Sequence, residues 1–155
     1  MKAKNVNGKI IIYNNIPKNW GNVIGVNYMS NDELKTLGFY DVVEPSRNRS
    51  QKYGIIYFDS DNEVFTYPVE NITFSQTVAQ LKEEKIESLK ELYNRELAKT
   101  DWYVVREAEG GTAVPGEIAT ERGNLRTECA THEANINAKT TKAQVVDYEL
   151  PSFSI

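Results

Sequence analysis

The chain is poor in the residues that build metal centres and disulfides. Its 155 residues include one cysteine, Cys129, and one histidine, His132. A single cysteine excludes an internal disulfide and a cysteine-based zinc site, and it fits a reducing cytoplasm. A single histidine excludes a histidine-based metal site within one chain, which leaves only a metal on the symmetry axis of an oligomer. We therefore expect no metal and no cofactor.

The chain also lacks long apolar runs and concentrated positive charge. No apolar run approaches the ~20 residues needed to cross a bilayer, and the polar start MKAKNVNGK has no signal-peptide core. The formal net charge is −4, and the 18 Lys and Arg residues are scattered among acids. Nucleic-acid binding needs a concentrated positive surface. These absences predict a soluble protein without a membrane or nucleic-acid partner.

What is present predicts an α+β fold that begins with a small β-rich domain over residues 1–73. Ser30 and Glu33 match a capping box, which predicts one or two helical turns closed by Gly38. The clearest hairpin signal has the polar loop 59–62 between two aromatic, β-branched runs. Because an isolated hairpin is marginal in water, we expect one small antiparallel sheet. Its strands are predicted at 9–13, 39–43, 53–58 and 63–67.

Residues 74–141 predict a helical hairpin that can also serve as an oligomerisation region. Over 75–99, apolar side chains form one stripe at helical period, interrupted by Lys82 and Lys85, so its N-terminal third should be more exposed. Over 115–140, side chains at positions 118, 122, 125, 129, 132 and 136 form a 4–3 seam. The seam is weak, so it needs the first helix folded back on it, a second copy of the chain, or both.

The predicted interface for helix packing or oligomerisation collects the apolar and seam positions of this hairpin. It comprises Leu89, Leu92, Tyr93, Leu97, Trp102, Ile118, Leu125, Cys129, His132 and Ile136.

The corner of the predicted hairpin is an apolar run, Trp102 to Val105. Thr100 and Asp101 break the first helical pattern before it, and Gly110-Gly111 reset the pattern after it. Trp102 and Tyr103 could stack on a ligand ring, but the sequence favours a hydrophobic pin that locks the corner.

The last segment, 142–155, predicts a strand followed by an extended arm. Alternation along it gives one apolar face, formed by Val146, Tyr148, Leu150 and Phe153. A strand without a partner would not stay ordered. This arm is therefore expected either to return to the N-terminal sheet or to dock on another molecule.

No motif predicts catalysis. Asp59, Asp61 and Glu63 resemble the start of a calcium loop, but Val64 stands where such a loop needs glycine, so they are interpreted as turn acids. Cys129 and His132 are three residues apart and could touch, yet nothing nearby suggests an oxyanion hole. The sequence leaves open whether Trp20 is exposed for binding or buried under the sheet.

Two blocks of the chain resemble small tail-fibre and tail-fibre-assembly proteins of tailed bacteriophages. The first runs from Lys52 to Asp59 and continues over Val64–Val69. The second combines Leu97 and Thr100–Arg106 with Gly111, Val114-Pro115, Arg122 and Leu125-Arg126, in the pattern L-x-x-T-D-W-Y-V-x-R, a glycine-containing gap, proline, R-x-x-L-R. The long helix and arm that follow depart from the usual short ending.

The resemblance implies a phage protein made in the host cytoplasm and places its function in viral assembly. The first hypothesis is a non-enzymatic structural protein of the virion, a tail-fibre or decoration component that contacts other phage proteins as a homo-oligomer. The second is an assembly chaperone for a tail fibre, absent from the mature particle. The third is a host-surface binding module that uses Trp20 and the aromatic residues of the sheet.

Overall fold

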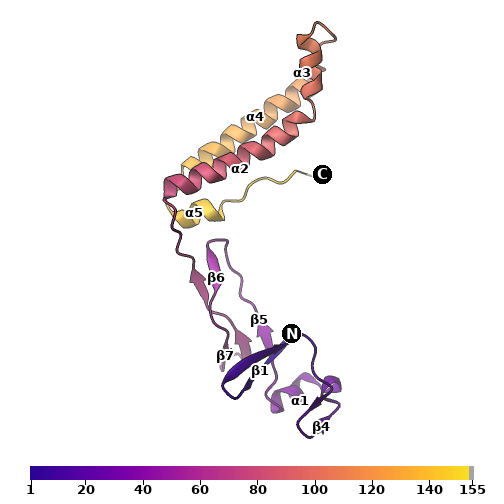
Figure 1. Cartoon of the computed structure of the whole chain (residues 1–155), viewed down its shortest axis with the longest axis vertical. Helices are drawn as coiled ribbons and strands as arrows, with labels where there is room; N and C mark the ends of the chain where they lie inside the picture. Colours follow the sequence, from indigo (N-terminus) through magenta and orange to yellow (C-terminus); the bar gives the residue numbers. More distant parts are fainter. Residues whose placement is uncertain (154–155) are drawn as a thin grey trace. The chain divides into compact units, whose positions relative to one another are not determined.

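The computed structural model of the chain describes residues 1–153 and has two compact units, Met1–Ile72 and Thr73–Ile155 (Figure 1). The first unit contains the strands and the second contains the long helices, so the predicted α+β class is confirmed. The boundary expected after residue 73 lies next to this division. The residues of the expected arm that the structure describes, 142–153, belong to the second unit together with the hairpin.

A five-stranded sheet forms the centre of the first unit, in the order β2-β1-β5-β8-β7. The predicted hairpin is present, with Phe58 opposite Phe65 in an antiparallel pair, but the strand expected over 53–58 is interrupted: residues 54–56 are in no strand, and Tyr53 belongs to β6 in another sheet. The prediction of a purely antiparallel sheet was wrong, because β5 and β8 run parallel. The second strand of the hairpin, rather than the first, lies beside β5, and this order forces the parallel direction. The strands are β1 (Lys2–Val6), β2 (Lys9–Tyr13), β5 (Tyr40–Val43), β7 (Tyr57–Asp59) and β8 (Val64–Thr66).

Strand β1 was not predicted, because its residues are mostly polar. It pairs with β2 through a two-residue turn, with Val6 opposite Lys9. Asn7 and Gly8 have φ angles of 52° and 82°, the left-handed conformation that this kind of hairpin turn requires at both positions. The Asn-Gly dipeptide was therefore the sequence signal for this hairpin.

The elements of the first unit outside the sheet contribute to an apolar cluster. Val26, Leu34 and Phe39 are its buried centre. The predicted capping box of α1 is present, since the Ser30 hydroxyl accepts from the Glu33 amide and the Glu33 carboxylate accepts from the Ser30 amide. The elements here are β3 (Asn19–Trp20), β4 (Val23–Ile24), η1 (Val26–Tyr28) and α1 (Asn31–Thr36), and β6 (Gln51–Tyr53) pairs separately with β9 (Val69–Asn71).

Trp20, whose exposure the sequence left open, packs into this cluster. Its ring meets the rings of Tyr13 and Phe39 edge to face, at centroid distances of 6.1 and 5.2 Å. The ammonium of Lys4 lies 4.5 Å from the centre of the Trp20 ring. The side chain is half-buried, so it belongs to the core of the first unit.

The second unit is a helical hairpin, as predicted, in which α2 (Val78–Ala98) and α4 (Gly116–Asn137) lie side by side (Figure 1). Every seam position of α4 is buried or half-buried, while most of its other residues are exposed, because α2 folds back on the seam. Leu89, Tyr93 and Ile136 form the buried centre. The first of the expected arrangements, intramolecular packing, is therefore present.

The two lysines that interrupt the α2 stripe have a structural function. The Lys82 ammonium donates to the carbonyl of Asn137 at 2.7 Å, and the Lys85 ammonium donates to the carbonyl of Val146 at 3.1 Å. Both carbonyls belong to the last residues of a helix, Asn137 of α4 and Val146 of the short helix over 142–147. Carbonyls at such positions have no amide donor within the helix. Leu81, beside them, is buried, so the start of α2 is less exposed than predicted.

The prediction of a strand at the start of the C-terminal arm was wrong. Residues 142–147 form a helix, α5 (Lys142–Asp147), which begins with a Thr141–Gln144 capping box and buries Val145. The Thr-x-x-Gln spacing of this capping box favours a helix over the strand that the alternating apolar residues suggest. After α5 the chain is extended, and Tyr148, Leu150 and Phe153 pack against the buried centre of the hairpin. Val146, also of the expected docking face, is half-buried.

Candidate functional site

The corner between α2 and α4 is held by one buried arginine. Arg122 is 7% exposed, and its Nη1 donates to the Leu97 carbonyl and to the Thr100 hydroxyl, both at 2.7 Å. Its Nη2 donates to the Asp101 carboxylate at 2.8 Å. A planar guanidinium with several fixed donors suits such a site better than a lysine ammonium. Arg122 therefore joins the second turn of α4 to the end of α2 and to the start of α3 (Asp101–Ala108).

A second arginine fixes the loop that leaves α3. The Arg106 guanidinium carbon lies 4.9 Å from the centre of the Trp102 ring and 5.3 Å from that of Tyr103. Arg106 also donates to the carbonyls of Thr112 and Ala113, and its own carbonyl accepts from the Gly111 amide. The side chain of one residue thus holds both the aromatic pair and the loop that leads to α4.

The helix α3 presents an apolar surface to solvent. Trp102 is 54% exposed and Val105 53% exposed, Val104 is also exposed, and no residue of α3 is buried. We call Trp102, Val104 and Val105 the corner surface. The predicted hydrophobic pin of Trp102 and Tyr103 is wrong for Trp102, which is mainly exposed, whereas Tyr103 is half-buried; the buried lock of the corner is Arg122. The seam spacing places Arg122 on the packed face of α4, but no local pattern connects its charge with Asp101.

The other residues of the predicted interface lie within the hairpin. Leu125 and Cys129 pack against the buried centre of Leu89, Tyr93 and Ile136. Leu92, Leu97, Ile118 and His132 are half-buried. Of the predicted set, only Trp102 is mainly exposed to solvent.

The single histidine and the single cysteine are half-buried on the packed side of α4. His132 Nδ1 is 2.7 Å from the Tyr148 hydroxyl, so its hydrogen bond holds the start of the extended arm. Burial raises the pKa of the Cys129 thiol. A nucleophilic cysteine needs a lowered pKa, because the thiolate is the reactive form. The environment of Cys129 thus acts against nucleophilic chemistry.

Burial likewise raises the pKa of the Tyr93 phenol. The nearby Glu128 carboxylate also raises this pKa. Tyr93 packs edge to face with Phe153 at a centroid distance of 5.2 Å. The ring of Phe153, at the end of the described arm, therefore packs on the uncharged phenol of Tyr93.

The acids that resemble a calcium loop are separated. The Asp59 carboxylate accepts from the amides of Asp61 and Asn62 and from the Asn62 side chain, which holds its pKa below the ordinary value. Glu63 instead pairs with the Lys35 ammonium at 2.6 Å. Among the described residues, no group of three or more His, Cys, Asp or Glu could hold a metal ion. The interpretation as turn acids accounts for these contacts.

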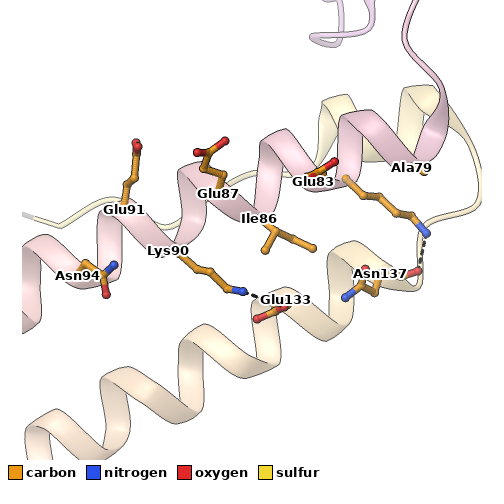
Figure 2. A pocket seen from close by; sticks show the side chains of 10 residues that line it. Ala79, Glu83, Ile86, Glu87, Lys90, Glu91, Asn94, Glu133 and Asn137 are labelled. Atoms are coloured by element: carbon orange, nitrogen blue, oxygen red, sulfur yellow. Dashed lines mark hydrogen bonds and ion pairs between the residues drawn. The ribbon is translucent and has the colours of Figure 1, made fainter.

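A groove of about 730 Å³ runs along α2 and α4 (Figure 2). Ile86 points into it, and Lys90 reaches across to Glu133 at 3.3 Å. Glu87 and Glu91 project away from α4. Because both lysines of the lining, Lys82 and Lys90, already contact α4, the groove presents engaged cations rather than a set of convergent ligand-binding groups.

Comparison of the chain with known proteins identifies no relative. No family model, no curated protein and no solved structure matches the chain. Over residues 1–153, no helix is long and apolar enough to cross a bilayer. The resemblance to tail-fibre proteins thus depends on the two sequence blocks. The residues that fix the corner all belong to the second block: Thr100, Asp101, Arg106, Gly111 and Arg122.

Proposed function

We propose that the chain is a non-enzymatic structural or attachment protein of a tailed-phage virion, and that it acts through protein–protein contacts. The observation that carries this proposal is the corner surface, an exposed tryptophan and two valines on a short helix fixed by Arg122. Single exposed apolar residues are common, but a group of this kind on one helix is typical of an interaction site.

The corner surface suits a contact with a larger partner. An eight-residue helix is about 12 Å long, so it is too short to cover the roughly 800 Å² per partner of a standard interface. Its convex apolar face fits a groove in another protein, in the way amphipathic helices are commonly recognised. The aromatic ring of Trp102 would supply the buried anchor of such a contact.

The resemblance to tail-fibre and tail-fibre-assembly proteins names the class of partner. A fibre or tail component would be the protein that receives α3 in an assembled particle. Tail-fibre and tail-fibre-assembly proteins usually have a short C-terminal ending, whereas this chain continues with the long α4 and the arm. This difference favours a component of the particle over a chaperone. The second candidate, an assembly chaperone, would use the same surface transiently and leave before the particle is complete.

Protein analysis of purified particles separates the two candidates. The proposal predicts that the chain is recovered in a fixed ratio to the other tail proteins after density-gradient purification. Absence from particles, together with co-purification with free fibres from infected cells, would establish the chaperone instead. Absence from both fractions would refute both candidates.

The host-surface hypothesis has less support from geometry. It relied on an exposed Trp20, and Trp20 packs against Tyr13 and Phe39 in the core of the first unit. Replacing Trp20 would therefore disturb folding before it tested binding.

A further inference from the structure

The turn between β1 and β2 joins an exposed asparagine to an exposed glycine. Asn7 is the one asparagine of the sequence that is followed by glycine. Within residues 1–153, no heavy atom beyond its chain neighbours lies within 4 Å of the place where a Cβ on Gly8 would be. The backbone nitrogen of Gly8 therefore has no side chain of its own, or of another residue, that would shield it from attack or keep it from attacking.

Asn7 and Gly8 together carry the two groups of an intramolecular amide exchange. The Gly8 nitrogen can attack Cγ of Asn7, because both atoms belong to adjacent residues and the attack closes a small ring. An attack within one molecule has the advantage of a high effective concentration. The N–Cγ bond forms, the Cγ–Nδ2 bond breaks, and the side-chain nitrogen leaves as ammonia with the proton of the Gly8 amide. The product is a cyclic imide, a succinimide.

Water then opens the succinimide at one of its two carbonyl carbons. Attack at Cγ restores the ordinary backbone and leaves an aspartate at position 7. Attack at the backbone carbonyl carbon leaves an isoaspartate, in which the chain runs through Cβ and Cγ. Asparagine is one of the thermolabile residues of proteins, and this hydrolysis needs no reagent other than water.

The folded hairpin holds the attacking nitrogen through a second asparagine. The Gly8 amide donates to Oδ1 of Asn5, in β1, at 2.9 Å. Side chains of asparagine often bond nearby backbone groups in this way. The Gly8 nitrogen has to give up its proton to close the ring, so an acceptor that holds this N–H group opposes the reaction.

We propose that Asn7 is a site of deamidation and that the Asn5 side chain sets its rate in the folded protein. Asn5 is a positioning residue, since it acts only through the Gly8 amide. While the hydrogen bond is present, Asn7 is preserved. When the hairpin opens, the Gly8 nitrogen is released and Asn7 is converted.

The two products have different consequences for the sheet. Aspartate, like asparagine, tolerates the left-handed conformation that Asn7 has, so the turn persists with one more negative charge. Isoaspartate adds a carbon to the backbone, and the loop length fixes the register that sets Val6 opposite Lys9. Strand β1 lies between β2 and β5 and buries Ala3 completely, so the isoaspartate form should have a less stable first unit.

Peptide mapping by mass spectrometry after incubation of the whole chain at mildly alkaline pH tests the site. The wild type should exchange an amide for an acid at Asn7, faster in urea than in the folded state. Asn5→Ala should raise the folded-state rate about fivefold, which is the effect of one ordinary hydrogen bond. Asn5→Asp keeps an acceptor for the Gly8 amide, so this matched control should stay slow. In urea, wild type and Asn5→Ala should react equally fast.

Two further measurements separate the chemistry from a loss of fold. Circular dichroism checks that each Asn5 variant is folded, and thermal unfolding compares Asn7→Asp with the chromatographically isolated isoaspartate form. Asn7→Asp should unfold close to the wild-type temperature, and the isoaspartate form at a lower one. Equal folded-state rates for wild type and Asn5→Ala, no conversion of Asn7 in urea, or an isoaspartate form as stable as wild type would overturn the proposal. None of these outcomes depends on the corner surface or on a phage partner.

Discussion

Arg122 and Asp101 form an unequal ion pair, 2.8 Å apart, in which the arginine side chain is 8% exposed and the aspartate 57% exposed. The arginine is desolvated and needs all its acceptors, whereas the carboxylate remains in contact with water. The two partners should therefore differ in their contribution to the corner of the helical hairpin.

Arg122→Ala should destabilise the second unit by about 2–3 kcal/mol. The change removes the guanidinium donor from the Thr100 hydroxyl and from the Leu97 carbonyl, which keeps the Thr100 amide and hydroxyl as donors, and it removes a buried side chain from the corner. Asp101→Asn should cost less than about 1 kcal/mol, because the Asp101 side chain is 57% exposed and an asparagine oxygen can still accept from Arg122. Arg126→Ala, at an exposed position of the same helix, is the control and should be neutral. Urea unfolding followed by circular dichroism measures all three, and equal costs for Arg122 and Arg126 would refute the assignment.

Two glycine-to-alanine changes should have opposite signs. Gly123 lies inside α4 with open space around an added Cβ, so Gly123→Ala should stabilise the second unit by roughly 1 kcal/mol. Gly8 has a φ of 82° in the β1–β2 turn, so Gly8→Ala should destabilise the first unit by roughly 1 kcal/mol. Thermal unfolding of each variant checks the signs. A stabilising Gly8→Ala would mean that this turn has another conformation.

The first turn of α1 should weaken in acid. Hydrogen bonds from the Ser30 amide and hydroxyl hold the pKa of Glu33 below its ordinary value of 4.5. Since the folded-state pKa is the lower one, the cap contributes fully above pH 4.5 and is lost as the pH falls through the folded-state pKa. An NMR titration of the Glu33 side chain should give a midpoint below 4.5, and Ser30→Ala should raise it. A midpoint at or above 4.5 in the wild type would contradict the cap.

The α2 cap provides an internal comparison for that titration. There, Thr77 and Gln80 form the same reciprocal contacts with a neutral amide in place of a carboxylate. The start of α2 should therefore keep its amide hydrogen-exchange protection through the pH range in which the start of α1 loses it.

Local signals in the sequence predicted the elements that depend on neighbours a few residues away. The Ser30–Glu33 spacing places a helix because both hydrogen bonds lie within one turn. The 4–3 seam of α4 identifies the residues that become buried against α2, since the period of a helix fixes its faces. The Asn7-Gly8 turn could have been predicted in the same way, but the polar residues of β1 concealed it.

Features that depend on distant residues could not be predicted from such signals. The parallel β5–β8 pair follows from which strand of a hairpin lies beside β5, and no local pattern encodes that order. The alternation in 142–150 suggested a strand, but a capping box at Thr141 and a place for Val145 against α2 favoured a helix. The contact of Arg122 with Asp101 joins residues 21 positions apart, so the exposure of Trp102 could not be deduced from the corner sequence.

The proposal that the chain acts by contact depends most directly on the corner surface. Phage particles assembled with the Trp102→Ser, Val105→Ser double variant provide the measurement, with Ile24→Ser as an exposed apolar control in the first unit. Circular dichroism first confirms that each variant keeps its helices. We predict that the double variant is lost from purified particles at least tenfold relative to wild type and that Ile24→Ser is retained. Particles that contain the folded double variant at the wild-type ratio would contradict the proposed function.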